Sequence, residues 1–521
     1  MMQPGSLKWR HGQPNELDDL LAAARRTGTR LAAIGDRLHF SGDSGSLSAE
    51  LRERLRERKL DVVRALRGPE FREHGRVESA PFLPQYRALF TKLQTGELGV
   101  NFANSTHWVA RLVERADLRA FAQVLRNLSR RHAILGARIE VRDGVPHFVL
   151  GPQVGAHFVD LRLRAGPDGA PLPEASLEAV LDQLVWRPFD LEKEPLFRSF
   201  IVRSADGGSV VGFVLHHLIG DAMSVSLLAR AVLGEYVSVV SGKPAAVVSS
   251  LQYSDYLLGM NEWLFGAGLR LRLAHWLEQL EGARSSCLPA DLHPAPGECG
   301  SVQAESAQLD AHLELAVRGG ARSAGISQFT FFLTVYACVL GRLLGTDDLV
   351  ILTMHHGRDH PALLPVVGSF QNQIPLRIRL SPDRSFGDLA RRVGGICTSA
   401  HEQLIPYGNL LYEFQQSGRA LVFPEFNFLD RRVLSGAGRR PACVPWEPVE
   451  VPAPLFQVPA ESHPFHVLDV VPYEGGVTLK ASYHDSIYKG GTLANLLDLY
   501  GRIARAAAEF ADTPIASLAS G

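Results

Sequence analysis

The chain has 521 residues, 46% hydrophobic and 21% charged, a composition that indicates a globular protein with two or more folded units. Its formal net charge of −1 argues against nucleic acid as a partner, because phosphate binding requires a clustered positive excess. Five cysteines without a Cys-x-x-Cys pair favour reduced thiols and a cytoplasmic location, and the first residues lack the apolar core of a secretion signal.

The first part of the chain, residues 1–68, is expected to form a small module of two helices around a hairpin. ELDDLLAAARRTG has helical spacing, and Gly28 would close that helix. RLAAIGDRLHFSG predicts two short strands around a turn at Gly35 and Asp36. Ser48 would then cap a second, highly charged helix, AELRERLRERKLDVVRALRG, with Gly68 after its end.

Residues 69–80 indicate a polar linker, and helices and strands alternate from there to the C-terminus. DLRAFAQVLRNLSRRHAIL is an amphipathic helix, SFIVR and SVVGFVLHH are strands, and TLANLLDLYGRIARAAAEFA is a closing helix. The Pro- and Gly-rich stretches 164–173 and 283–301 predict loops. FTFFLTVYACVLGRLL, after a cap at Ser327 and before Gly345, is too short and interrupted to span a bilayer, so we expect a buried helix and no membrane partner.

An adjacent histidine pair, His216 and His217, follows the apolar run VVGFVL, with Asp221 four residues beyond the second histidine. A continuous apolar run predicts a strand buried on both faces, and functional side chains gather at such strand ends. His217 can act as a general base, because imidazole titrates near neutral pH. Asp221 would either orient the imidazole or hold the loop by pairing with a distant arginine. The alternative is a capped strand end with a buried, hydrogen-bonded histidine.

A second pair, His355 and His356, stands in MHHGRD with a different spacing and predicts a loop feature. Neither pair has a neighbour at metal-ligand spacing such as His-Glu-x-x-His, so no metal is expected.

HHLIGDAMS resembles the HHxxxDG core of condensation domains of nonribosomal peptide synthetases, in the chloramphenicol acetyltransferase-like superfamily. RRHAILGARIEV resembles the family's RHExLRTxF segment and retains Arg131, His132 and Leu135. Other segments match the family in its own order, namely RPFDLEKEPLFR, LQYSDYL, HWLEQLEG, LPAD, TDDLVILTMHHGRDH, VVGSFQNQIPLRIRL and AHEQLIPYGNLL. The resemblance covers residues 80–520.

This resemblance implies an α+β or α/β fold with two chloramphenicol acetyltransferase-like lobes in a V, at 81–260 and 261–521, and a tunnel that reaches His217. It implies His217 as the catalytic histidine, within a catalytic motif that also contains His216 and Asp221. Asp221 would be a structural anchor paired with Arg358. The implied structural residues of the active site are completed by Asn372 on its wall, together with Ala222 and Ser224.

The sequence departs from the family pattern at three positions. Ala222 replaces the usual glycine after the aspartate, and its Cβ would narrow the channel or move the loop where a substrate arm approaches. Ala133 and Gly136 replace a glutamate and an arginine of the earlier motif.

The N-terminal αββα module resembles the tubulysin-type (TubC-like) docking domain of megasynthase subunits. Its hairpin would offer a strand edge to an extended peptide. An acidic C-terminal tail of an upstream subunit would suit the basic side chains beside it, which are Arg52, Arg54, Arg56, Arg58 and Lys59. The alternative for these side chains is a solvated charged helix face. HFSGDSGSL (residues 39–47) superficially resembles a carrier-protein motif, but it follows a predicted hairpin and not a helix start.

The function implied by the resemblance is amide formation between an acyl or peptidyl group, carried as a thioester on a donor carrier protein, and an amine acceptor. No cofactor is expected to bind directly, and the phosphopantetheine arms of donor and acceptor carrier proteins would enter the site. Ester formation is the close chemical alternative. Epimerisation of a tethered aminoacyl group would need a glutamate where Met354 stands. A non-catalytic scaffold with a degenerate condensation fold is the alternative from a different class.

Overall fold

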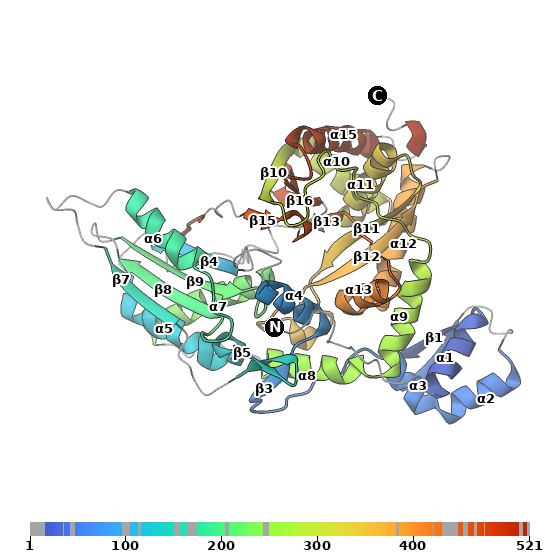
Figure 1. Ribbon diagram of the computed structural model, residues 1–521, viewed down its shortest axis with the longest axis horizontal. Helices are drawn as coiled ribbons and strands as arrows, with labels where there is room; N and C mark the ends of the chain where they lie inside the picture. Colours follow the sequence, from blue (N-terminus) through green and yellow to red (C-terminus); the bar gives the residue numbers. More distant parts are fainter. Residues whose placement is uncertain are drawn as a thin grey trace.

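The structure is a computed structural model in which an N-terminal module, an N lobe and a C lobe follow one another (Figure 1). It describes residues 16–34, 36–41, 47–95, 105–112, 116–150, 157–163, 174–203, 208–242, 250–381, 385–419, 421–429, 446–451, 457–462, 466–473, 475–509 and 514–517.

The N-terminal module contains α1 (Glu16–Arg26), the antiparallel hairpin of β1 (Arg30–Ile34) and β2 (Arg37–Ser41), α2 (Ala49–Glu57) and α3 (Lys59–Leu66). Gly28 follows α1 with a φ of 77°, and the side chain of Ser48 caps α2 by accepting the N–H of Leu51 at 3.1 Å. Both predicted helix signals are therefore confirmed. Gly35, the loop 164–173 and part of the carrier-like stretch lie outside the described residues.

The prediction of a single charged helix after Ser48 is wrong, because the chain forms two helices that meet at Arg58. Leu55 and Val62 are both fully buried. In one continuous helix the apolar stripe between these two residues would pass through Arg58 and Lys59. The break turns these two cations away from the core, and Arg58 instead pairs with Asp61 at 2.8 Å.

The linker between the module and the N lobe is packed against the protein. His74 binds Asp255 through its backbone N–H at 2.9 Å and through Nδ1 at 3.1 Å. The ring of Phe71 lies 5.4 Å from that of Tyr256. Asp255 and Tyr256 belong to α8 (Tyr253–Leu264), so α8 fixes the path of the linker.

The N lobe is built on a five-stranded sheet in the order β14-β4-β9-β8-β7, of which β9 is buried along its whole length. A three-stranded sheet, β3-β6-β5, lies beside it. The elements of this lobe are β3 (Ser79–Pro81), α4 (Pro84–Thr95), β4 (Ser105–Leu112), α5 (Leu118–Arg131), the 3-10 turn η2 (Ala133–Gly136), β5 (Arg138–Arg142), β6 (Val145–Val149), β7 (His157–Arg162), α6 (Glu174–Trp186), β8 (Phe197–Arg203), β9 (Ser209–His216) and α7 (Ala222–Ser241).

The C lobe is built on a seven-stranded sheet in the order β12-β11-β13-β16-β17-β10-β15. Its elements are α9 (Ala267–Gln279), β10 (Cys299–Asp310), α10 (Ala311–Ser323), α11 (Gln328–Leu344), β11 (Asp348–His355), η3 (Pro361–Leu363), β12 (Asn372–Arg379), α12 (Phe386–Glu402), α13 (Tyr407–Gln416), β13 (Glu425–Phe428), β15 (Gln457–Pro459), η4 (Ala460–Ser462), β16 (Val467–Tyr473), β17 (Gly476–His484), α15 (Gly490–Glu509) and η5 (Ile515–Ser517).

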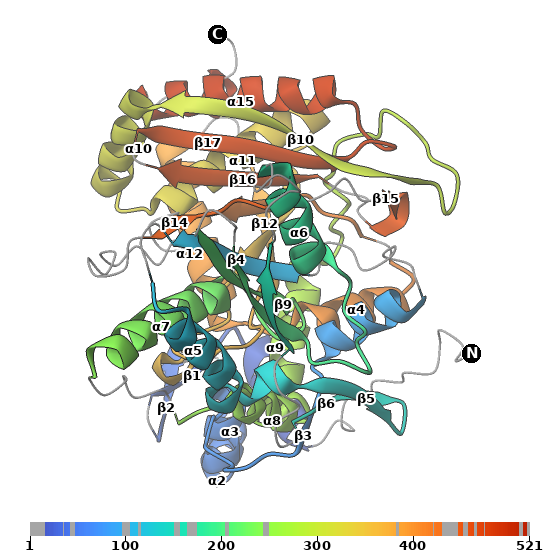
Figure 2. The ribbon, with the colours of Figure 1, turned by 90° about the vertical axis from the view of Figure 1, so that its left-hand side faces the viewer.

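The two lobes diverge from a shared base near α8 and α9 (Figure 1). The expected boundary at residue 260 falls inside α8, so this helix belongs to the base. Late in the chain, β14 (Trp446–Pro448) crosses to the N lobe and pairs antiparallel with β4. Figure 2 shows β14 beside β4 at the level where the two sheets approach each other. One continuous hydrophobic cluster runs through both lobes.

Two apolar helices pack as parts of these lobes. α11 begins at the Ser327 cap and ends at Gly345, as predicted, and most of its side chains are buried. By length and composition alone, α7 could also cross a membrane, and so could α10 and α11 if taken as one span bent by 105°. However, α7 starts at the lobe interface and buries Leu228 and Val232 in the N lobe.

Candidate active site at the lobe interface

The histidine pair lies at the end of β9, followed by a tight turn and then α7. The backbone N–H of Ile219 bonds to the carbonyl of His216 at 2.9 Å, and Asp221 caps α7 by accepting the N–H of Ser224 at 2.8 Å. A Cβ on Gly220 would come within 2.5 Å of Leu215 Cδ1, so a larger residue here would displace that buried side chain. The rigid strand end and the helix cap therefore fix the positions of both histidines.

His216 points into the N lobe and is only 3% exposed. Its Nδ1 accepts the N–H of Leu218 at 3.1 Å, and its ring packs edge-on against Phe189. Burial lowers the pKa of His216 to about 3, with smaller effects from His217 and Arg198. A ring that is enclosed and stays neutral does not suit proton transfer, so we propose a structural role for His216 in place of the expected catalytic one.

His217, the next residue, remains partly exposed. Desolvation lowers its pKa below the ordinary value of 6.5, while the nearby charge of Asp221 and a hydrogen bond with the backbone of Gly220 act in the opposite direction. The net effect leaves the imidazole neutral at physiological pH. It can therefore accept a proton from a substrate that reaches the turn.

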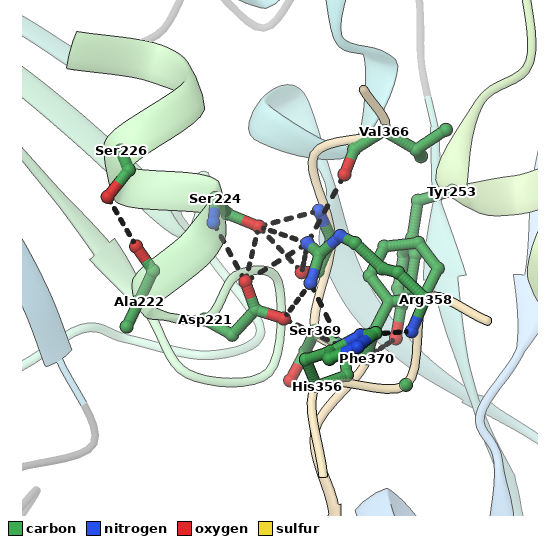
Figure 3. Close-up of polar contacts among 12 residues, drawn as sticks. Asp221, Ala222, Ser224, Ser226, Tyr253, His356, Arg358, Val366, Ser369 and Phe370 are labelled. Atoms are coloured by element: carbon green, nitrogen blue, oxygen red, sulfur yellow. Dashed lines mark hydrogen bonds and ion pairs between the residues drawn. The ribbon is translucent and has the colours of Figure 1, made fainter. Parts of the chain in front are cut away.

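Asp221 and Arg358 form the ion pair that the resemblance implied, and this pair joins the two lobes (Figure 3). Arg358 Nη1 donates to Asp221 Oδ2 at 2.7 Å, and Nη2 donates to Oδ1 at 3.0 Å. Both residues are at most 2% exposed, and the guanidinium also lies 4.2 Å from the centre of the Phe370 ring. Such a fully buried bidentate pair fixes the loop and leaves the carboxylate no freedom to act as a base.

Ser224 completes this contact between the lobes. Its hydroxyl donates to the carbonyl of Gly368 at 2.7 Å and accepts from the N–H of the same glycine at 3.0 Å. Arg358 Nη2 also reaches the hydroxyl at 3.0 Å, and the N–H of Phe370 binds Asp221 Oδ2 at 3.1 Å. Asp221 and Ser224 of the N lobe thus bind Arg358, Gly368 and Phe370 of the C lobe, and we call these five residues the lobe latch.

Two tyrosines support the lobe latch from the side of the shared base, and sequence reasoning assigned them no role. The hydroxyls of Tyr86 and Tyr253 both donate to the carbonyl of Ser369. A Cβ on Gly368 would lie 2.1 Å from the ring of Tyr253, so this glycine lets the loop approach the ring. Tyr253 stands in LQYSDYL, a segment that matched the family pattern, and this match was the only signal in the sequence.

The departures from the family pattern are accommodated locally. Ala222 is the first residue of α7, where the helical backbone accepts a Cβ without strain, so the local fold does not have to move. The expected narrowing of a substrate channel stays a prediction. Ala133 and Gly136 lie in η2, and the N–H of Ala133 binds Gln252 Oε1 at 3.2 Å. Arg131 forms an ion pair with Glu235 of α7.

Asn372 begins β12 directly opposite His355 of β11. Both ends of its amide bind the backbone, since Nδ2 donates to the carbonyl of Ile405 at 2.7 Å and Oδ1 accepts the N–H of Tyr407 at 2.9 Å. Asn372 therefore holds the segment that leads into α13. The expectation that Asn372 also lies on the wall of the active site stays a prediction.

The second histidine pair ends β11 and enters the loop that carries Arg358. The rings of His355 and His356 stack 4.6 Å apart, and Asp359 Oδ1 lies 3.1 Å from His355 Nε2, so these three residues could converge on a cation. However, Nδ1 of each ring accepts a backbone N–H, at 3.1 and 2.9 Å, which places the proton on Nε2. A metal would need that Nε2 lone pair, so the backbone contacts oppose coordination.

The basic residues expected to meet a tail are distributed over α2 and α3. Arg54 and Arg58 each lie 3.5 Å from Glu16, and Arg56 lies 3.2 Å from Glu53. Arg52 and Lys59 are exposed. Carboxylates within the module thus neutralise part of the expected positive surface.

The module is joined to α9 of the C lobe by both apolar and charged contacts. Ala267 of α9 shares a hydrophobic cluster with the buried leucines of α1 and with Leu55. Asp18 and Arg270 pair at 2.9 Å, and both side chains are largely buried. The orientation of the module relative to the lobes is therefore set by packing.

Comparisons with known proteins agree with this architecture. Residues 91–520 match the family model described as "Condensation domain", and residues 17–67 match the "TubC N-terminal docking domain". Malpinin synthetase of Mortierella alpina is 30% identical over 287 residues, which are 54% of this chain and 4% of the relative. The chain thus spans only a small part of such curated relatives.

Solved structures show the same fold at low identity. The X-domain from teicoplanin biosynthesis has a TM-score of 0.72 at 19% identity, over 86% of this chain and 99% of that one. That X-domain was also solved in complex with OxyB, with a TM-score of 0.71 at 19% identity, over 86% of this chain and 98% of that one. A structure on condensation domain-mediated chain release from the enacyloxin polyketide synthase covers 96% of both chains, with a TM-score of 0.66 at 18% identity.

Proposed function

This chain belongs to the condensation-domain family, with an N-terminal TubC-type docking domain, and we propose that it joins a carrier-bound acyl or peptidyl thioester to an amine. The observation that carries the proposal is the placement of His217. A neutral, partly exposed imidazole stands on a rigid turn where the two lobes meet, beside the lobe latch.

The proposed reaction needs one proton acceptor and precise positioning. The amine nitrogen attacks the thioester carbonyl and forms the new C–N bond, while His217 takes the proton that the nitrogen loses. The tetrahedral intermediate then expels the pantetheine thiolate, which breaks the C–S bond, and the proton passes to the sulfur. Holding two tethered substrates in line contributes on the order of 7–11 kcal/mol, so a weak base is sufficient.

The partners follow from this proposal. The docking domain would recruit an upstream synthetase subunit through that subunit's C-terminal tail, and donor and acceptor carrier proteins would present their phosphopantetheine arms. An edge of the two-stranded β1–β2 sheet suits an extended peptide, and the exposed Arg52 of α2 and Lys59 of α3 suit an acidic one.

Two alternative functions are compatible with this site. Ester formation with a hydroxyl acceptor uses the same geometry. A scaffold role is supported by the likeness to an X-domain that forms a complex with OxyB. Epimerisation has less support, because Met354 occupies the position of the glutamate that such domains require, with Gln373 opposite it.

Reconstitution with candidate carrier proteins, loaded acyl groups and amine or hydroxyl acceptors, followed by intact-protein mass spectrometry, tests these options. We expect His217→Ala to lose product while still binding carriers, and His356→Ala, at an exposed histidine of the second pair, to retain it. If the unsubstituted chain binds carriers but yields neither amide nor ester, the scaffold role is favoured. Equal turnover by His217→Ala would contradict the catalytic assignment.

A further inference from the structure

The N lobe contains a buried cation that forms no ion pair among the residues that the structure describes. Arg198 of β8 is 4% exposed, and its guanidinium lies 3.9 Å from the centre of the Phe189 ring. Nη2 donates to the carbonyl of Arg187, whereas Nε and Nη1 are enclosed and have no hydrogen-bond partner among the described residues. An unpaired buried charge is costly, and arginine cannot avoid the cost by losing its proton at neutral pH.

His216 presents a further enclosed donor on the same face of the sheet. Arg198 pairs with Val214 in the β8–β9 ladder, and His216 is two residues further along β9, so both side chains project to one side. Both also pack against Phe189. Because Nδ1 of His216 accepts the N–H of Leu218, its proton is on Nε2, and this atom too lacks a partner among the residues described.

The carboxylate that most directly affects Arg198 is already bound elsewhere. Glu194 acts on the pKa of Arg198 through its charge. However, Glu194 Oε2 accepts from Arg187 at 2.6 Å, and Oε1 accepts the N–H of Asp190 at 2.8 Å. Arg198 and His216 therefore offer three donors and one positive charge but no acceptor.

We propose that Arg198 and His216 form a binding site for a small monovalent inorganic anion of the chloride class. One such ion balances the single guanidinium charge and accepts hydrogen bonds from several directions. A multivalent oxyanion would bring more negative charge into the interior than one cation offsets. The site lies behind the turn that carries His217, and an occupant would hold the ring of His216 and so the start of that turn. The proposal does not depend on the proposed reaction.

Bromide is a suitable probe, because it replaces chloride and scatters anomalously. Crystals of the full chain grown or soaked in sodium bromide should give an anomalous peak in contact with Nε or Nη1 of Arg198. A feature at this place without anomalous signal would be a water molecule and would overturn the proposal. Because this experiment uses the unsubstituted chain, it tests the proposed anion site even if a variant does not fold.

Thermal unfolding gives a second test in solution. Replacing chloride by methanesulfonate at equal ionic strength should lower Tm by about 1–3 °C for the unsubstituted chain. Arg198→Met should abolish this difference. Arg203→Met is the matched control, because Arg203 lies on the same strand but pairs with Asp160 at 2.7 Å near the surface, and it should retain the difference. An equal chloride effect in all three proteins would contradict the assignment.

Discussion

Arg358 donates two hydrogen bonds to the carboxylate of Asp221, at 2.7 and 3.0 Å, across 137 positions of sequence and from one lobe to the other. The pair is almost completely enclosed, and the hydroxyl of Ser224 and backbone groups of Gly368 and Phe370 form further hydrogen bonds with it. Only Nε of Arg358 has no hydrogen-bond partner among the described residues, and the guanidinium lies over the ring of Phe370. The turn that carries His217 therefore depends on a contact that both lobes must supply.

Arg358→Met should destabilise the protein by about 3–5 kcal/mol, because it leaves the carboxylate of Asp221 buried without its cation. The measurement is urea unfolding monitored by fluorescence. Arg391→Met is the control, since Arg391 and Asp388 form an exposed pair at 2.6 Å that should contribute no more than about 1 kcal/mol. Similar losses in the two variants would mean that burial of the latch pair contributes little.

Gly368→Ala should destabilise the lobe latch by about 1–3 kcal/mol or more, because the new Cβ would lie 2.1 Å from the Tyr253 ring. Gly395→Ala is the matched control, since Gly395 lies within α12 with no atom within 4 Å of an added Cβ, and alanine favours a helix. The Tm and the rate of product formation should both be lower for Gly368→Ala, whereas neither should be lower for Gly395→Ala. A well-folded, fully active Gly368→Ala would show that the loop can move without consequence.

Stability should decrease as the pH falls below the ordinary histidine value of 6.5. Burial lowers the pKa of His216 to about 3 and that of His132 to about 4. Between these values and pH 6.5, the two histidines bind protons in the unfolded chain but not in the folded protein. The free energy of unfolding is therefore unaffected by them above pH 6.5 and decreases progressively below it. At pH 5 each of the two histidines should lower the free energy of unfolding by about 2 kcal/mol. Unfolding measured between pH 5 and 8 checks this, and His216→Gln should show a shallower dependence.

Product formation should persist below pH 6.5, because burial lowers the pKa of His217 and the ring stays neutral there. The acceptor should be an aromatic amine, because its nitrogen stays neutral over the same pH range. The pH–rate profile then measures the titration of a group on the enzyme and not that of the substrate. The rate should fall only at a pH below 6.5, as the imidazole becomes protonated. A half-maximal rate at or above this value would place the titrating group elsewhere.

Reversing the exposed charges of the docking module, in Arg52→Glu with Lys59→Glu, should weaken binding of an acidic upstream tail roughly tenfold, or about 1.4 kcal/mol. Fluorescence anisotropy of a labelled tail peptide measures this, and the effect should shrink at high salt. Arg322→Glu, on the exposed surface of α10, should leave binding unchanged. If the reversed module binds as well as the original, the charged helix face is only solvated.

Sequence patterns predicted those features whose causes are local. The buried strand ending at His216, the caps at Ser48 and Ser327 and the stop at Gly345 each depend on neighbours within a few residues. The pairing of Asp221 with Arg358 came from family resemblance and not from spacing.

Features that depend on distant parts of the chain could not be predicted. Whether His216 is enclosed depends on Phe189 and Arg198, which belong to other segments. The hydroxyl of Tyr253 binds Ser369, which lies 116 positions later in the sequence, and the neighbouring Gly368 packs against the same ring. The break at Arg58 reflects the position of the module core and not the helix propensity of its charged residues.

The antiparallel pairing of β14 with β4 affects how such synthetases can be recombined. Trp446 lies within the second half of the chain, between β13 and β15, yet it completes the sheet of the first half. The centre of its ring lies 5.9 Å from that of Trp108. A chimaera that exchanges only the first half at a crossover point near α8 would place a foreign strand against this edge. Engineers who graft the first half should therefore transplant residues 446–448 together with it.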